Sequence, residues 1–362
     1  MTVAKKPPGR EKEPAEAKAP ARTIAAVRHF ARDDKVLIVI TADPDSISCA
    51  VALKRLLWRR VAAVSVASTN EVRRPDNLRL IKALGLSLPL LTEVDLSHYT
   101  KLAMVDSQPH HSPLTAGLKF SLVVDHHPQV PPETYQTPEF SDIRSDFGAT
   151  ATIFVSYLKS AGIKPNHLLA TALFYAIKTD TQNFVRQGQL DDMRAFRWLY
   201  PLIHQPLLSD IERAPMSRDS FKVMLRALAQ TVFGHNHAAV HFERLDHPDT
   251  LVLAADFLMQ IDGVDRVVTS GVFEGRLIVV LRSAGIRSSN LGRLAQGCFG
   301  QYGSAGGHKN MARAEMELDK VDPRGAMKPQ QLQNFVRRRL REGLSKKKDA
   351  APPAARRPEE HK

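Results

Sequence analysis

Acidic side chains and a pair of histidines stand at positions in this sequence where they could bind divalent cations. Carboxylate oxygens are the ligands of hard cations, and imidazole suits manganese, iron or zinc. Several carboxylates close together would repel one another unless cations balanced their charge. Two divalent ions about 3.5–4 Å apart can activate water and neutralise a phosphoryl group. The residues in question are Asp43, Asp45, Asp106, Asp125, His126, His127 and Asp180.

Several of these positions also have a plain structural explanation. Asp45 could cap the helix that follows it, and Asp43 could form a turn with the proline next to it. His126 and His127 could be incidental polar residues at the end of a strand. An acidic residue at the carboxyl end of a helix opposes the helix dipole, however, so structure alone explains Asp180 poorly.

The elements that must position these side chains alternate between strands and helices. Short apolar runs indicate strands buried on both faces, and segments with apolar residues at helical spacing follow them. This order favours an α/β fold with a mostly parallel, doubly wound sheet carrying helices on both faces, in which ligands bind at the carboxyl ends of the strands. The sequence predicts strands over 36–41, 61–67, 102–105 and 122–124, and helices over 46–59, 77–84, 149–159, 167–178 and 191–200, with Gly85 as a C-cap.

The second half of the chain is expected to form a smaller α+β domain. Here the sequence predicts strands over 237–242, 266–273, 276–282 and 312–318, and helices over 250–260, 290–297 and 329–340. His235, His237 and His241 are expected to be exposed strand residues. The expected domains are 23–200 and 235–344, joined by a connector over 201–234 and flanked by disordered tails at 1–22 and 345–362.

A glycine-rich segment at 303–310 offers a second candidate site. Small residues allow backbone N–H groups to approach a phosphate closely, and nearby guanidinium and ammonium groups would supply charge. A glycine-rich segment alone is more often an ordinary turn, so the flanking basic residues decide in favour of an anion site. The candidate residues are Arg282, Ser283, Arg287, Gly306, Gly307, His308 and Lys309.

Composition excludes several classes of protein. The 362 residues are 43% hydrophobic, but no apolar run approaches the roughly 18 residues that a membrane-spanning helix needs. The amino-terminal segment does not look like a secretory signal, and two cysteines are too few for a disulfide framework, so a cytoplasmic protein is expected. Most of the net charge of +13 lies in the tails, with +3 over 1–22 and +6 over 337–362. The mildly basic body favours short substrates over long nucleic acid.

Taken in order, these motifs resemble those of the DHH phosphoesterase family. The resemblance covers about residues 34 to 320 and points more narrowly to the branch of nano-RNases, oligoribonucleases and pAp phosphatases. Five motifs in one order are far more specific than any one of them. The matching stretches are Asp43-Pro44-Asp45, Val105-Asp106, Asp125-His126-His127, Thr179-Asp180-Thr181 and Gly306-Gly307-His308-Lys309, with support from 148–152 and 177–184.

The resemblance implies a catalytic DHH domain and a DHH-associated domain, with the substrate between them. It implies two divalent ions, manganese above all, with Mg²⁺ or Co²⁺ as alternatives. His127 and Asp180 would be the catalytic residues, His127 facing the substrate phosphate, and the anion-site residues of the second domain would bind the nucleotide. The ligands would be Asp43 and Asp106 for one ion, and Asp45, Asp106, His126 and Asp180 for the other.

One position departs from the family pattern. The family commonly has a histidine four residues before the first aspartate, where this sequence has Val39. The first ion could then bind weakly, gain a substitute ligand such as His110 or His111, or be lost together with hydrolysis while nucleotide binding persists. A surface-loop role for both histidines is favoured over metal binding.

The sequence therefore predicts a metal-dependent phosphoesterase of short oligonucleotides or 3′-phosphorylated nucleotides, acting as an exonuclease or a nucleotide phosphatase. A cyclic dinucleotide or a polyphosphate chain is an alternative substrate, because such motifs recognise the phosphoryl group and not the base. Further alternatives are a non-hydrolysing nucleotide-binding protein and nonspecific nucleic-acid binding through the basic tails. The expected partner is the nucleotide substrate. No membrane is expected to take part, and a homodimer is possible.

Overall fold

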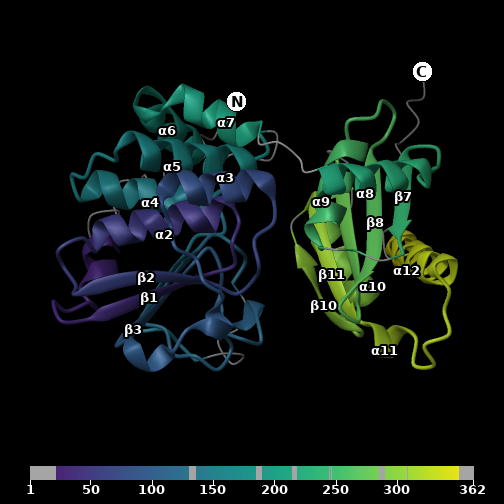
Figure 1. The fold of residues 1–362 in the computed structure, drawn as a ribbon, viewed down its shortest axis with the longest axis horizontal. Helices are drawn as coiled ribbons and strands as arrows, with labels where there is room; N and C mark the ends of the chain where they lie inside the picture. The colour runs from purple at the N-terminus through teal and green to yellow at the C-terminus, as the bar shows by residue number, and fades with distance from the viewer. Residues whose placement is uncertain are drawn as a thin grey trace, which may run out of the picture. The chain divides into compact units, whose positions relative to one another are not determined.

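The chain divides into two compact units, Met1–Pro215 and Met216–Lys362. Figure 1 labels their elements in a computed structural model. No helix among the described residues is long and apolar enough to cross a lipid bilayer. The structure describes residues 22–129, 136–184, 190–213, 218–243, 245, 247–284, 290–307 and 309–349.

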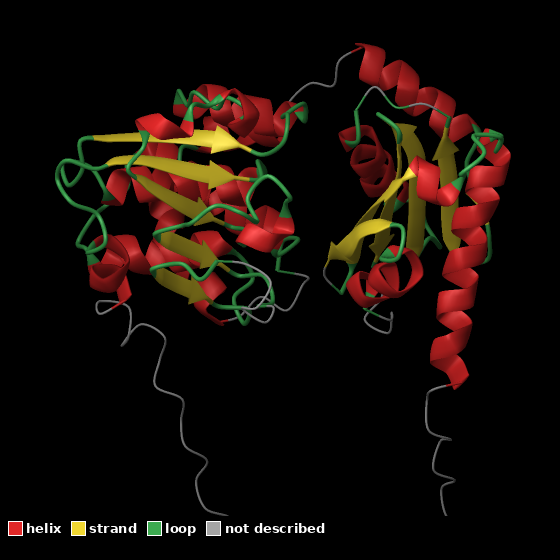
Figure 2. Ribbon diagram, turned by 90° about the horizontal axis from the view of Figure 1, so that it is seen from below, coloured by secondary structure: helices red, strands yellow, loops and turns green. Residues whose placement is uncertain are grey.

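The first unit is built on a five-stranded sheet. Its strands are β1 (Lys35–Ile40), β2 (Ala63–Ser68), β3 (Lys101–Val105), β4 (Leu122–Asp125) and β5 (Phe140–Ile143). They lie in the order β2-β1-β3-β4-β5 and are all parallel, as Figure 2 shows. The chain runs outward from β1 to β2 and then returns to β3 on the other side of β1. Ligands of such sheets bind at the carboxyl ends of the strands where the direction reverses.

The two faces of this sheet are covered unequally. The helices are α2 (Pro44–Leu56), α3 (Pro75–Leu84), α4 (Thr150–Ser160), α5 (His167–Asp180), α6 (Leu190–Leu199) and α7 (Gln205–Glu212). They lie over one face (Figure 1), while the other packs against short 3-10 turns at Leu91–Glu93 and Leu96–His98. The expected α/β class with a parallel sheet is confirmed, and among the described residues of the connections after β3 and β4 no α-helix covers the second face.

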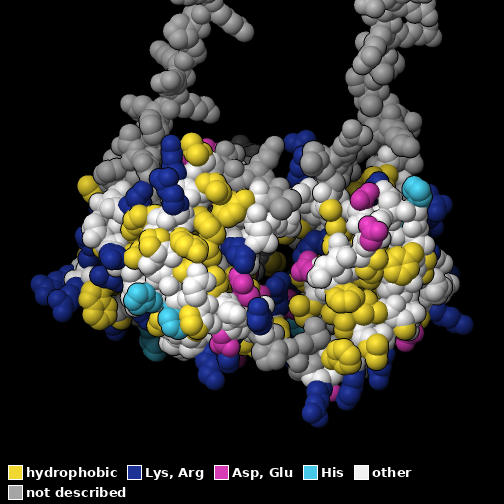
Figure 3. Space-filling model, turned by 90° about the horizontal axis from the view of Figure 1, so that it is seen from above, with side chains coloured by type: hydrophobic (Ala, Val, Ile, Leu, Met, Phe, Trp, Pro, Cys, Tyr) yellow, Lys and Arg dark blue, Asp and Glu magenta, His cyan; other side chains and the backbone are white. Residues whose placement is uncertain are grey.

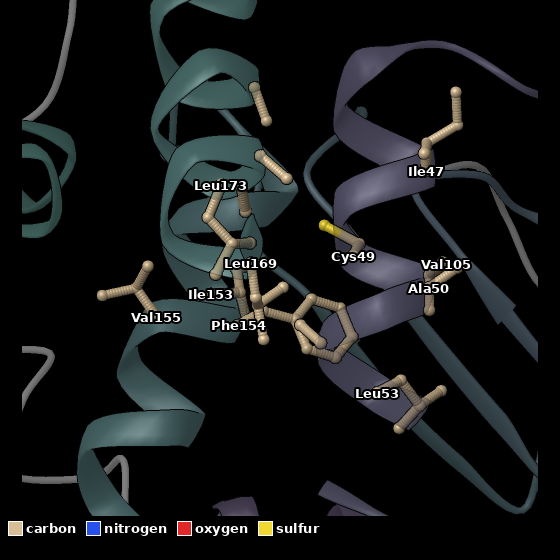
Figure 4. Close-up of a cluster of buried hydrophobic side chains, with 14 of the residues drawn as sticks. Ile47, Cys49, Ala50, Leu53, Val105, Ile153, Phe154, Val155, Leu169 and Leu173 are labelled. Atoms are coloured by element: carbon tan, nitrogen blue, oxygen red, sulfur yellow. The ribbon is translucent and has the colours of Figure 1, made fainter. Parts of the chain in front are cut away.

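Three helices make the core above the sheet. Ile47 and Leu53 of α2 are buried beside Phe154 of α4 and Leu173 of α5 (Figure 4). α2 begins with a capping box, in which the Asp43 carboxylate accepts a hydrogen bond from the Ser46 N–H at 2.8 Å. Because α2 starts directly after β1, this core fixes the carboxyl end of the central strand.

Two elements of the first unit were not predicted. β5 carries Asp142, which is buried and accepts hydrogen bonds from Arg144 and from Tyr157. A strand that buries a carboxylate shows no clear apolar pattern in the sequence. α7 lies in the segment predicted as the connector 201–234, whose weak periodicity concealed it. The other end of that segment holds all of α8 (Arg218–Ala229) and a short strand.

The second unit is the expected smaller α+β domain. Its strands are β6 (Val232–Phe233), β7 (His237–Phe242), β8 (Arg266–Phe273), β9 (Arg276–Ser283), β10 (Gly303–Gly307) and β11 (Met311–Glu317), in the order β10-β11-β9-β8-β7-β6. Only β7 and β8 pair in parallel among these strands. α8 and α9 (Asp249–Leu258) pack on one face, and α10 (Leu291–Phe299) and α12 (Pro329–Asp349) pack on the other, with α11 (Leu318–Val321) following β11.

Three expectations for the second unit were wrong. Residues 303–307 of the glycine-rich segment form the edge strand β10, where no strand was predicted, because glycines let α10 and β11 approach its backbone closely. α12 continues to Asp349, into the stretch predicted as a disordered tail, since Lys and Arg are good helix formers. His241 is only 6% exposed, because its side of β7 is covered by α12.

Candidate metal centre

The first two acidic residues stand at the start of α2. Asp43 caps the helix through Ser46 and is half-buried. Asp45 is fully buried, and its carboxylate accepts hydrogen bonds from the backbone N–H groups of Thr150 at 2.7 Å and Ala151 at 2.8 Å. α4 has no side-chain cap of its own, so Asp45 satisfies N–H groups that the first turn of α4 leaves without a helical partner.

Asp106 follows β3 directly and lies beside the end of β4. Its φ of +58° is in the left-handed region, which a non-glycine residue adopts at a cost of about 1–3 kcal/mol and which is concentrated at functional sites. Its Oδ1 accepts a hydrogen bond from the Thr150 hydroxyl at 2.7 Å and lies 3.7 Å from Nε2 of His126. The strand ends therefore bring these side chains together as the sequence predicted.

The two histidines after β4 are oriented in different ways. His126 is buried, and its Nδ1 lies 3.2 Å from the carbonyl oxygen of Phe147, which places the Nδ1 proton there and Nε2 toward the carboxylates. His127 is more exposed, and its Nδ1 lies 2.8 Å from Oδ1 of Asp125. Each ring thus has its tautomer set by a neighbouring acceptor, which is the usual support of a metal-binding or phosphate-binding histidine.

Asp180 completes the cluster from the end of α5. Its Oδ2 lies 3.2 Å from Nε2 of His126. Two groups of side chains in the described part of the chain place one ligand atom each within 4.8 Å of one another. They are Asp45, His126 and Asp180, and Asp106, His126 and His127.

The charges in this cluster explain why it would bind a cation. Burial and the negative charge of Asp180 raise the pKa of Asp45 to about 7. Burial and the charge of Asp45 likewise raise the pKa of Asp106 well above its usual range. Burial alone would lower the pKa of His126, but the hydrogen bond and charge of Asp180 raise it to about 10. Crowding thus favours the protonated form of these carboxylates, and a cation would take the place of the protons.

The residues present fit a divalent ion. Three carboxylates and one imidazole converge, which is the oxygen-and-nitrogen donor set that manganese and similar ions accept. Asp45, His126 and Asp180 would hold the ion, with Asp106 beside them. Asp43 is close enough to Asp180 for the charge of each to act on the other, but its carboxylate belongs to neither group and caps α2.

Val39, the residue at which the sequence departs from the family pattern, packs as a core residue. Val39 is fully buried in the small core beneath the sheet, among Leu37, Met104 and Phe120. Nδ1 of His111 lies 3.2 Å from the backbone N–H of Gln108, which donates to its lone pair. Neither His110 nor His111 belongs to a ligand group of the described residues.

The anion-site residues predicted in the second unit are only partly grouped. Arg282 is on β9, and its guanidinium donates to Asp256 of α9 at 2.8 Å, whereas Ser283 points to the opposite face of the sheet. The Ser283 N–H donates to the carbonyl of Asn310, which brings the ends of β9 and β11 together near the exposed Lys309. Gly306 and Gly307 are in β10. Arg287 and His308 lie outside the described residues.

The sequence did not single out two side chains that support the cluster. Gln108 is fully buried, and its amide donates to Oδ2 of Asp125 at 2.7 Å, so that Asp125 holds His127 in a fixed direction. Thr150 donates to Asp106 from the first turn of α4. Thr150 occurs in the stretch 148–152 that supported the resemblance, but neither residue type has a spacing that reveals such a contact.

No model of a protein family matches this sequence. Over 284 residues the chain is 30% identical to an uncharacterized protein of Methanocaldococcus jannaschii, an alignment that covers 78% of this chain and 58% of that protein. The chain thus spans less than two thirds of the length of this relative.

Solved structures give the comparison of folds. An exopolyphosphatase-related protein from Bacteroides fragilis has a TM-score of 0.70 and 16% identity, covering 93% of this chain and 99% of that one. The exonuclease RecJ bound to manganese has 14% identity and covers 93% of this chain and 96% of that one, but its TM-score of 0.46 is too low to bear on this chain. At such identities a likeness concerns the fold alone. The first likeness shows that this chain and the protein from Bacteroides fragilis share a fold.

Proposed function

We propose that this protein is a metal-dependent phosphoesterase of short oligonucleotides or 3′-phosphorylated nucleotides. The observation that carries the proposal is the convergence of Asp45, Asp106, His126 and Asp180, which come from two strand ends and two helices, at the carboxyl edge of the sheet. Burying several acids with raised pKa values in one place destabilises the fold. A bound cation would offset this cost.

The roles of the side chains follow from their contacts. A divalent ion, when bound, would supply a Lewis acid that activates water and neutralises charge on the phosphoryl group. Asp45 and Asp180 would hold that ion with His126. His127 is the most exposed member of the cluster and is oriented by Asp125, so it would contact a substrate phosphate.

The size of the substrate is argued from charge. Of the net charge of +13, +3 lies over 1–22 and +6 over 337–362, and the rest of the chain is only mildly basic. On the face shown in Figure 3, Lys and Arg side chains of the described residues are scattered among apolar and acidic ones and do not form a continuous strip. Long single strands need an extended basic groove with aromatic platforms. A substrate of a few nucleotides does not.

The test is hydrolysis by purified protein with and without a divalent ion. Full-length protein stripped with EDTA and then supplied with Mn²⁺, Mg²⁺ or Co²⁺ would be given a labelled dinucleotide and a 3′-phosphorylated adenosine nucleotide. We expect metal-dependent release of mononucleotide or phosphate. The Asp45→Asn variant should lose at least about 100-fold in the rate of hydrolysis, because removing a direct ligand costs more than removing a residue that only supports a ligand. Bound metal without any product would contradict the proposal.

A polyphosphate chain is the second candidate substrate. The protein from Bacteroides fragilis that shares the fold is described as exopolyphosphatase-related, and the ligand cluster would recognise a phosphoryl group in either substrate. The same assay with linear polyphosphate and a cyclic dinucleotide separates the candidates by competition. Faster phosphate release from polyphosphate than from the nucleotide would favour this alternative.

A further inference from the structure

The first turn of α4 contacts two of the clustered carboxylates at once. The Thr150 N–H donates to Oδ2 of Asp45 at 2.7 Å, and the Ala151 N–H donates to Oδ1 at 2.8 Å. The Thr150 hydroxyl donates to Oδ1 of Asp106 at 2.7 Å. Thr150 therefore hydrogen-bonds to both Asp45 and Asp106.

These hydrogen bonds leave the carboxylates able to bind a cation. Each carboxylate oxygen has two lone pairs, and the contacts with α4 use one lone pair on three of the four oxygens. Oδ1 of Asp45 also accepts a hydrogen bond from the Cys49 thiol at 3.4 Å, and the remaining lone pairs stay available for a second interaction. The contacts instead fix how each carboxylate is turned about its side-chain bonds, which is the role of outer-shell partners in metal sites.

Asp106 needs such support more than the other acids. Its backbone is in the left-handed region, directly after a buried strand, so its side chain leaves the sheet in a direction that ordinary strand residues do not take. The hydroxyl of Thr150, which donates to Oδ1 of Asp106 at 2.7 Å, fixes one orientation of this side chain.

The donor itself is held rigidly. Thr150 is fully buried, and the neighbouring residues Ile153 and Phe154 of α4 pack in the core with no exposure. The loop before α4 is fixed by Asp192, which accepts hydrogen bonds from the Gly148 N–H at 2.9 Å and the Thr152 hydroxyl at 2.5 Å. α4 therefore behaves as a fixed frame against which the two carboxylates are aligned.

We propose that Thr150 is a positioning residue that holds Asp45 and Asp106 in register for a shared divalent ion. The inference rests on the proposed function in so far as the cluster binds a metal. α4 supplies none of the ligands, but through Thr150 it controls how tightly the ion binds. Thr150 acts through Asp45 and Asp106 and is not itself a ligand.

The test compares three changes at one position. Thr150→Val keeps the shape of the side chain and removes the hydroxyl, Thr150→Ala removes the hydroxyl with a residue of high helix propensity, and Thr150→Ser keeps the hydroxyl. Mn²⁺ affinity of the full-length protein would be measured by calorimetry. We expect Mn²⁺ to bind about 10- to 100-fold more weakly to the Val and Ala variants. The Ser variant should keep an affinity close to that of the wild type.

A matched control separates positioning from general stability. Thr171 is also fully buried in a helix, and its hydroxyl bonds the carbonyl of His167 and the N–H of His204. Thr171→Val should lower the thermal midpoint of the metal-free protein without a comparable loss of Mn²⁺ affinity. A merely structural role for Thr150 would make the two Val variants alike in both measurements.

The outcomes distinguish the two proposals. Wild-type Mn²⁺ binding together with unchanged affinity in the folded Val and Ala variants would overturn the role of Thr150 and leave the metal site intact. Weakened binding in the Ser variant to the level of Val would also contradict it, because the hydroxyl would then not matter. Absence of Mn²⁺ binding to the wild type would overturn both proposals.

Discussion

Nε2 of His126, which follows β4, lies 3.2 Å from Oδ2 of Asp180, which ends α5. This contact joins the strand side of the cluster to its helix side. The same imidazole has Oδ1 of Asp106 at 3.7 Å, and it belongs to both ligand groups of the described residues. His126 is thus shared by the two ligand groups.

Removal of this imidazole should abolish tight metal binding. In His126→Gln we expect Mn²⁺ affinity, measured by calorimetry, to fall by more than about 100-fold, because the loss of a direct ligand weakens binding more than the loss of a residue that supports a ligand, which costs about 10- to 100-fold. His98→Gln is the control, since His98 is an exposed histidine of the same unit. Equal Mn²⁺ affinity in the two variants would show that the cluster is not the metal site.

Asp43 combines a structural and an electrostatic role that two substitutions can separate. Asn caps a helix as well as Asp does, whereas Ala in place of a cap costs about 1 kcal/mol. Burial and the charge of Asp180 raise the pKa of Asp43, so its charge is unfavourable without a cation. In EDTA, urea unfolding should find Asp43→Asn at least as stable as the wild type and Asp43→Ala about 1 kcal/mol less stable than Asp43→Asn.

The same pair of variants tests whether Asp43 contributes to metal binding. If it does, both variants should hold fewer Mn²⁺ ions per chain, or hold them more weakly, regardless of their stability. Wild-type stoichiometry and affinity in Asp43→Asn would limit Asp43 to its role as a cap.

The second unit should lose stability in mild acid because of His241. Burial lowers the pKa of His241 to about 4, from an ordinary value of 6.5. Between these values the unfolded chain binds a proton that the folded chain does not, so stability rises with pH over this range and is lost as pH falls through it. From pH 7 to pH 5 the loss is about 2 kcal/mol.

A comparison of two histidines on β7 isolates this effect. Urea unfolding of His241→Asn at pH 5 and pH 7 should show a smaller difference than the wild type by about 2 kcal/mol. His237 is exposed on the same strand, and His237→Asn should leave the difference unchanged. An unchanged difference in His241→Asn would mean that His241 becomes protonated in the folded unit.

Two glycines of α10 should respond to alanine in opposite directions. A Cβ on Gly292 would lie 2.1 Å from the backbone oxygen of Gly307, and neither backbone can yield easily, so Gly292→Ala should cost about 1–3 kcal/mol. Gly297 has no atom within 4 Å of an added Cβ, so Gly297→Ala should stabilise α10 by up to about 1 kcal/mol. Thermal unfolding of both variants tests the close packing of β10 on α10. Equal changes in stability in the two variants would contradict it.

Local patterns fixed most elements of both units. The apolar runs of β1, β3 and β4 and the helical spacing of α2 and α5 are visible without any partner, because burial on both faces or on one helical face leaves a periodic signature. Gly85 ends α3 in the left-handed conformation that the sequence predicted. β5 left no such signature, since Asp142 is buried by ion pairing with Arg144 and not by apolar neighbours.

The sequence by itself determined that acids stand at strand ends and that a parallel sheet would gather them at one edge, because parallel strands share a direction. Only the tertiary structure decided which oxygens meet which donors. The reach of Thr150 from α4 to Asp106, the hold of Gln108 on Asp125 and the burial of His241 depend on segments packed from elsewhere in the chain. Such contacts have no period in the sequence, so no local pattern could reveal them.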